Sequence, residues 1–207
     1  MTTPKHAMRR YFLGALILSC MLSSFAKAAE VEVQVTNIAG ATIENAVVYL
    51  EPKDKTAPFI KNQAEIAQKN KTFIPLVTVI QAGSTIIFPN KDSVRHHIYS
   101  FSPAKTFELK LYSGVPSTPV VFDKAGTVVL GCNIHDQMLA FVYIVDTPYF
   151  AKTDASGKVK ISDVPNGDYL LKVWHYGLKK ENVTVDRQVS TKDIGTIKMV
   201  IDTKVSI

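Results

Sequence analysis

Short apolar runs, each closed by turn residues, recur along most of this chain. Val31–Val35 alternates apolar and polar residues with period two, which is the pattern of a half-buried β-strand. Turn sequences such as Asp154–Gly157 and Pro165–Gly167 separate the runs at intervals of about 8–12 residues. The pattern predicts an all-β protein made of antiparallel β-sandwiches. The other runs expected to be strands are Ala46–Leu50, Leu76–Ile80, Thr85–Phe88, Thr106–Leu111, Thr127–Leu130, Leu139–Val145, Lys158–Ile161, Tyr169–Trp174, Asn182–Val185 and Ile194–Ile201.

Two segments interrupt the succession of strands. Asn62–Lys71 is short and polar, and we expect it to be a linker or a single helical turn. A domain boundary is expected near Asp146–Pro148, because the residues that could bind a metal lie before it. The turn-rich β segment that follows carries no cluster of metal ligands.

The first 28 residues have the organisation of an export signal. Lys5, Arg9 and Arg10 form a positive start, Tyr11–Leu22 is an apolar run, and a small-x-small cleavage sequence ends at Ala28. The apolar run is shorter than the roughly 20 residues that a membrane-spanning helix needs. We therefore expect cleavage after Ala28, an extracytoplasmic or periplasmic protein, and no membrane span in the mature chain. A retained anchor and a lipoprotein processed at Cys20 are the alternatives.

Removal of the signal changes the charge of the protein. The whole chain of 207 residues has 24 basic and 18 acidic side chains, a net charge of +6. Cleavage removes four basic residues and no acidic one, which leaves a net charge of +2. Because no basic patch with interleaved aromatic residues remains, we expect no nucleic-acid partner. A hydrophobic content of 46% excludes wholesale disorder, and 2 cysteines exclude both a disulfide-dense scaffold and a four-cysteine zinc site.

One short motif carries the metal chemistry. Cys132, His135 and Met138 form a C-x2-H-x2-M run directly after the apolar strand Thr127–Gly131. Thiolate and thioether sulfur atoms suit Cu(I), and imidazole also suits Cu(II). Without the signal, Cys132 is the only cysteine of the chain, so an internal disulfide is excluded. A second imidazole could come from the upstream pair His96-His97, which would complete a two-His, one-Cys set with a weak Met ligand.

Other interpretations of the motif were weighed. A buried Cys or Met is often only part of the core. Zinc is less suitable, because a thioether is a poor zinc ligand. A Cys–His hydrolase would leave Met138 without a role. A copper oxidase needs more ligands than the four histidines of the mature chain, so we expect that the protein is not an enzyme.

On these residues the segment from about Phe73 to Asp146 resembles a cupredoxin, a small blue copper protein of the plastocyanin and amicyanin type. The spacing of the C-x2-H-x2-M run is similar to that of amicyanin, and the same segment resembles exported proteins labelled methylamine-utilisation-like. The resemblance implies a cupredoxin Greek-key β-sandwich over residues 57–146. It also implies one type 1 copper ion. The ligands implied for this ion are His96, Cys132, His135 and Met138.

One position departs from the cupredoxin pattern. His97 stands where relatives often carry Asn, which leaves the choice between His96 and His97 to other arguments. Adjacent side chains of a strand point to opposite faces, so both are not expected to bind the same ion. We favour His96, and we expect Asn90 to help hold the ligand loops or to be an ordinary turn residue.

The flanking segments resemble a second family. Residues 30–56 and 147–207 are similar to the small carboxypeptidase-regulatory or transthyretin-like β-sandwich, which would make the cupredoxin segment an insertion. In the competing view, the first of these segments extends the cupredoxin. Tyr169 and Trp174 are expected in the core of this second sandwich, with His175 on the surface beside them.

The sequence therefore predicts an exported mononuclear copper protein that acts in one-electron transfer. Its partner would be a transient redox protein, reached through a partly exposed His135. Two alternatives remain: a non-redox copper carrier or buffer, and an interaction module with a structural copper site.

Overall fold

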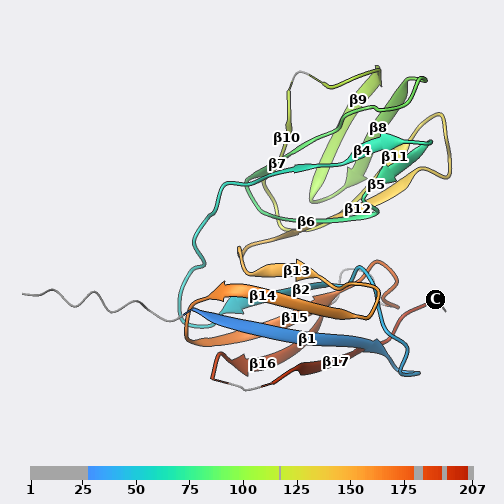
Figure 1. Ribbon diagram of the computed structural model, residues 1–207. Helices are drawn as coiled ribbons and strands as arrows, with labels where there is room; N and C mark the ends of the chain where they lie inside the picture. The colour runs from blue at the N-terminus through green and yellow to red at the C-terminus, as the bar shows by residue number, and fades with distance from the viewer. Residues whose placement is uncertain (1–27, 117, 180–183, 193–194, 205–207) are drawn as a thin grey trace, which may run out of the picture.

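The computed structural model describes residues 28–204 except 117, 180–183 and 193–194. The described residues form 17 β-strands and no helix, so the all-β prediction is confirmed. Figure 1 shows the strands in two groups, with β3–β12 in one and β1, β2 and β13–β17 in the other. The segment predicted to be an export signal lies outside the described residues except for Ala28, and β1 begins at Ala29.

The first group is built on a five-stranded sheet. Its strand order is β6-β12-β11-β8-β9, and all neighbours are antiparallel except β6 and β12. A three-stranded sheet of order β10-β7-β3 and the β4–β5 hairpin complete this group. The strands are β3 Gln63–Glu65, β4 Ala67–Lys69, β5 Thr72–Ile74, β6 Val77–Gln81, β7 Ser84–Ile87, β8 His96–Ser102, β9 Lys105–Tyr112, β10 Val120–Phe122, β11 Gly126–Cys132 and β12 Leu139–Val145.

The core of the first group lies between these sheets. Phe88, Ile98, Phe122, Leu130 and Val142 are among its fully buried side chains. Cys132 and Met138 belong to the same core. The C-x2-H-x2-M motif is therefore anchored in packed hydrophobic residues at both ends.

The second group has two sheets and its own core. One sheet has the order β14-β1-β17, with β1 parallel to β17, and the other has the order β13-β2-β15-β16. Tyr169 and Trp174 are buried here as predicted, with 1% and 3% of their surfaces exposed. His175, expected on the surface, is 2% exposed, so that prediction is wrong. The strands are β1 Ala29–Asn37, β2 Val47–Pro52, β13 Phe150–Lys152, β14 Lys158–Val164, β15 Asp168–Trp174, β16 Val185–Ser190 and β17 Ile197–Ile201.

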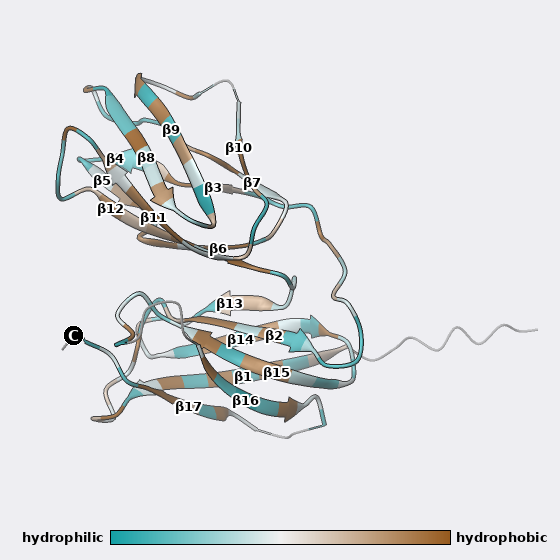
Figure 2. Ribbon diagram, turned by 180° about the vertical axis from the view of Figure 1, so that it is seen from behind, coloured by the Kyte–Doolittle hydropathy of each residue, from teal (hydrophilic) through white to brown (hydrophobic). Residues whose placement is uncertain are grey.

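Strand β12 contributes to both cores. Ala140, Val142 and Ile144 face the first core, whereas Tyr143 and Val145 pack in the second. Figure 2 shows the two groups from behind, with β6 and β13 lying where the groups face each other. Burial on both faces explains why the β12 sequence is an almost continuous apolar run.

Several expected elements differ in the structure. Asn62–Lys71 forms β3 and β4 instead of a linker or a helical turn, because its backbone pairs with β7 and β5. Strands β5, β8, β10 and β13 were not expected either. The expected strand Asn182–Val185 falls mainly on residues outside the described part, and β16 begins at Val185. None of the described residues belongs to a helix that is long and apolar enough to span a membrane.

Candidate copper site

The C-x2-H-x2-M motif forms the loop of the β11–β12 hairpin. Cys132 is the last residue of β11, and the last paired residues of the hairpin are Gly131 and Leu139. Within the loop, the backbone N–H of Met138 donates to the carbonyl of His135 at 2.9 Å, which closes a turn between these two residues. The hairpin fixes both ends of the loop, so it also fixes the backbone positions of Cys132 and Met138.

His96 enters the site from a different strand. It is the first residue of β8. Ile98, two residues further along this strand, pairs with Cys132 of β11. The loop before β8 is held by Asn90, whose Nδ2 donates to the carbonyls of Val94 and Tyr112 at 2.9 Å each. Asn90 thus supports the loop before His96, whereas these two bonds do not reach the Cys132–Met138 loop, which it was also expected to help hold.

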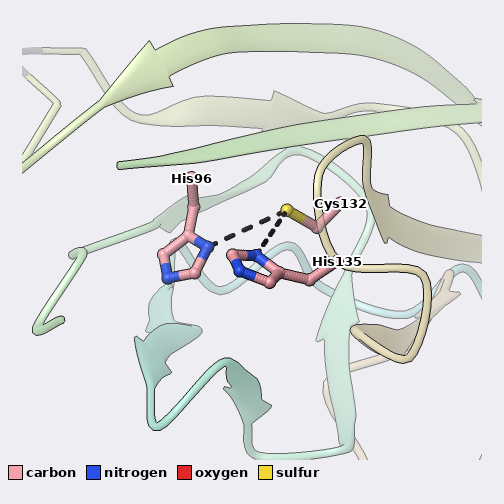
Figure 3. A group of neighbouring side chains, drawn as sticks. All are labelled: His96, Cys132 and His135. Carbon is pink, nitrogen blue, oxygen red and sulfur yellow. Dashed lines mark hydrogen bonds between the residues drawn. The ribbon is translucent and has the colours of Figure 1, made fainter. Parts of the chain in front are cut away.

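His96, Cys132 and His135 converge at one point, as Figure 3 shows. His96 Nδ1 lies 3.8 Å and His135 Nδ1 lies 3.9 Å from Cys132 Sγ. The candidate ligand atoms of the three residues all lie within 4.8 Å of one another. His96 and Cys132 are buried, and His135 is partly exposed at the rim.

Met138 is buried beside this group. Only 1% of its surface is exposed, and it packs in the same core as Cys132. Met138 and Cys132 also line one side of a surface hollow together with Tyr99 and Leu139. Met138 and Cys132 therefore share one core and line one hollow.

His97 points away from the group. Its Nε2 lies 2.9 Å from a carboxylate oxygen of Glu108 on β9, and it lines a hollow with Tyr99, Phe101 and Phe107. This orientation follows from the alternation of side chains along β8. Of the two adjacent histidines, the structure brings His96 to Cys132 and His135.

The second nitrogen of His96 meets a carboxylate that the sequence did not reveal as part of the site. His96 Nε2 lies 2.8 Å from Asp92 Oδ2. The backbone N–H groups of Asn70 and Lys71 also donate to Asp92, at 2.6 Å and 2.9 Å. The pKa of Asp92 is held below its usual value mainly by the N–H of Lys71, with smaller contributions from His96 and the N–H of Asn70.

Two further polar residues stabilise the segment that leads into the loop before β8. Gln68, fully buried on β4, donates through Nε2 to the carbonyl of Phe88 at 3.2 Å and to the hydroxyl of Tyr112. Tyr112 in turn donates to the carbonyl of Phe88 at 2.6 Å, and burial raises its pKa to about 12. Gln68, Asp92 and Tyr112 lie in unremarkable stretches of sequence, and only their hydrogen bonds reveal them.

The donor atoms of this site fit a copper ion. Metal–sulfur and metal–nitrogen bonds of about 2.3 Å and 2.0 Å let one ion contact both atoms when they lie within roughly 4.3 Å of each other. The separations of 3.8 Å and 3.9 Å from Sγ to the two imidazole nitrogens satisfy this limit. Two imidazoles, a thiolate and a nearby thioether are the ligand types of blue copper sites.

Comparison with known proteins adds a likeness to cupredoxins. No family model and no curated protein matches the sequence. A purple cupredoxin from Nitrosopumilus maritimus is 23% identical and matches 40% of this chain and 99% of its own, with a TM-score of 0.35. Amicyanin from Paracoccus versutus is 13% identical over 47% of this chain and 97% of its own, with a TM-score of 0.35.

A larger copper protein is also similar in part. The Cu-containing nitrite reductase from Thermus scotoductus is 20% identical and has a TM-score of 0.38. The match covers 46% of this chain and 25% of that one. Each of these three structures matches less than half of this chain.

Proposed function

We propose that this chain is an exported mononuclear type 1 copper protein that transfers single electrons. The observation that carries the proposal is the convergence of His96 Nδ1 and His135 Nδ1 on Cys132 Sγ, with Met138 buried alongside. A copper ion bound there would supply a one-electron couple. The residues would hold it with three strong donors and one weak donor.

The rigidity of the site supports electron transfer. Cys132 is the last residue of β11, Met138 directly precedes β12, and His96 follows the loop that Asn90 holds. Ligands that keep their positions in both oxidation states reduce the rearrangement that accompanies each transfer. His135 is partly exposed, and the adjacent Ile134 is 47% exposed, so this loop offers an edge where a redox protein could dock transiently.

The same donor set argues against catalysis at the metal. Catalytic metal sites keep an open coordination position for water or substrate. Here His96, Cys132, His135 and Met138 would occupy the positions around the ion. We therefore infer that the protein is a carrier and not an enzyme, and that it works outside the cytoplasm, where its predicted export signal would deliver it.

The spectrum of the protein with Cu(II) tests this function. We expect one equivalent of Cu(II) to produce an intense blue absorption band that disappears on reduction and returns on oxidation. Cys132→Ser should abolish the band, whereas the matched substitution Ser100→Ala, at a buried residue of β8, should retain it. Colourless binding of Cu(I) alone would favour a copper carrier, and a blue band in the Cys132→Ser variant would refute the proposed site.

A further inference from the structure

The carboxylate of Asp92 lies directly behind the buried imidazole of the candidate copper site. Asp92 Oδ2 is 2.8 Å from His96 Nε2, while His96 Nδ1 faces Cys132 Sγ at 3.8 Å. The side chain of His96 is 0% exposed and that of Asp92 is 12% exposed. The two nitrogens of one ring therefore have separate roles, one toward the thiol and one toward the carboxylate.

A tight turn holds this carboxylate in place. Strands β4 and β5 are joined by Asn70 and Lys71, which have φ angles of 54° and 56°, as both central residues of a type I′ hairpin turn require. In this conformation both backbone N–H groups point at the side chain of Asp92. The backbone of Asp92 is held as well, because its N–H donates to Asn90 Oδ1 at 2.9 Å.

These contacts determine where the proton of neutral His96 lies. An ionised carboxylate only accepts hydrogen bonds, so the contact with Asp92 requires a hydrogen on His96 Nε2. Neutral imidazole then has its lone pair on Nδ1, the nitrogen that faces Cys132. The ring is thus set in the tautomer and orientation that metal binding needs before any ion arrives.

Charge adds a second effect. A negative charge hydrogen-bonded to a ligand imidazole makes that imidazole a stronger donor. Next to the buried ring of His96, where the effective dielectric constant is lower than in water, the same charge favours the more positive oxidation state of a bound ion. His135 differs, because no carboxylate contacts its ring in the described part of the chain.

We infer that Asp92 is a positioning residue which fixes the Nε2–H tautomer of His96 and stabilises Cu(II) relative to Cu(I) in this site. The inference rests on the proposed function, since it concerns the same ion. The β4–β5 turn takes part through the N–H groups of Asn70 and Lys71. Segments well separated in sequence thereby set the properties of one ligand.

Asp92→Asn separates this role from a general effect of charge. The introduced amide can keep its oxygen toward His96 and Lys71, but its NH₂ group then faces the N–H of Asn70. The control is Asp136→Asn, which removes a charge from an exposed position next to His135 but leaves the carboxylate that contacts His96 in place. The measurement is the reduction potential of the copper-loaded variants by spectroelectrochemistry.

We expect Asp92→Asn to lower the affinity for Cu(II) relative to Cu(I) about tenfold, within the range found for such outer partners. For a one-electron couple this change raises the potential by about 59 mV. Asp136→Asn should change it much less. Equal shifts in the two variants, or no shift in Asp92→Asn, would overturn the inference and leave the proposed blue copper function standing.

A second measurement needs neither copper nor a substitution. Long-range ¹H–¹⁵N correlation spectra of the copper-free protein report which ring nitrogen of each histidine carries hydrogen. We expect His96 to be the Nε2–H tautomer at neutral pH. An Nδ1–H tautomer would refute the positioning role even if the copper-loaded protein is blue, whereas absence of any blue copper species would refute the proposed function instead.

Discussion

The indole ring of Trp174 stacks on the phenol ring of Tyr143, with ring centroids 4.4 Å apart and an interplanar angle of 15°. Trp174 ends β15 of the second group of strands, whereas Tyr143 lies on β12, the strand that follows the candidate copper loop. The hydroxyl of Tyr143 also lies 3.2 Å from that of Tyr49 on β2. A strand that carries one end of the site is therefore packed against the other core.

Trp174→Ala should destabilise both groups of strands together. Loss of a buried Trp side chain costs about 3–5 kcal/mol, and here it also removes the ring against which Tyr143 packs. We expect the blue band of the copper-loaded variant and the far-UV circular dichroism to be lost at a lower denaturant concentration, in one shared transition. Leu171→Ala, at a buried residue of the second core that belongs to none of these aromatic pairs, should shift the same shared transition. Separate transitions in the unsubstituted protein would contradict the coupling.

The adjacent histidines should respond differently to substitution. We expect His96→Ala to eliminate the blue spectrum, because it removes the imidazole that faces Cys132. His97→Ala should keep the spectrum, because it removes a ring that faces Glu108 and Tyr99 instead of Cys132. Absorption spectra of both variants with equimolar Cu(II) provide the measurement. A blue His96→Ala and a colourless His97→Ala would reverse the assignment.

Gly131 has room for no side chain unless Tyr99 moves. A Cβ atom on Gly131 would lie 2.8 Å from Cζ and from the hydroxyl oxygen of Tyr99, which pairs with it from β8. Gly131→Ala should therefore cost about 1–3 kcal/mol, the usual range for overpacking. In a Tyr99→Ala background the same substitution should cost much less. Chemical denaturation of the four proteins measures this coupling, and an equal cost in both backgrounds would disprove the steric cause.

The buried His175 should make the protein less stable at mildly acidic pH. Burial lowers the pKa of His175 below its usual value of about 6.5, with the carbonyl of Glu44 acting in the opposite direction. Between the lowered pKa and 6.5 the unfolded chain binds more protons than the folded one, so stability is present above 6.5 and is lost as the pH falls below it. One such group contributes at most about 1.4 kcal/mol per pH unit.

His175→Asn isolates this contribution. Nδ1 of His175 accepts a hydrogen bond from the N–H of Gly177 at 3.1 Å, and the amide oxygen of Asn can accept the same bond. We expect the free energy of unfolding of the variant to fall less steeply between pH 7 and pH 5. Urea titrations at several pH values on copper-free protein give the comparison. Parallel pH profiles would show that His175 does not titrate in this range.

Local patterns predicted the central strands and the motif of the site. Strand β12 was expected at Leu139–Val145 and begins and ends there, because burial on both faces produces one unbroken apolar run. Cys132, His135 and Met138 could be recognised because they lie in one short loop. Metal binding by these residues and His96 stays a prediction, although the structure brings three of the four side chains together.

The features that the sequence did not predict depend on contacts between distant segments. Asp92 is an ordinary loop residue until the turn at Asn70 and Lys71 reaches it, and that turn belongs to a segment too polar to be expected as strands. His175 follows a buried Trp, and its own burial depends on the packing of the second group of strands. Neither contact has a sequence signature, because each partner lies far away along the chain.

The order of the strands has a consequence for how the protein folds while its chain is being synthesised. Strand β1 has its partners in β14 and β17, and β2 has its partners in β13 and β15, whereas β3–β12 pair only among themselves. A chain that appears from its N-terminus can therefore complete the strands around the candidate copper loop by Val145, while β1 and β2 still have open edges. Such edges pair readily with other chains. These edges lack partners until β13–β17 have emerged, so the interval before Ile201 emerges is the period in which this protein most needs protection from aggregation.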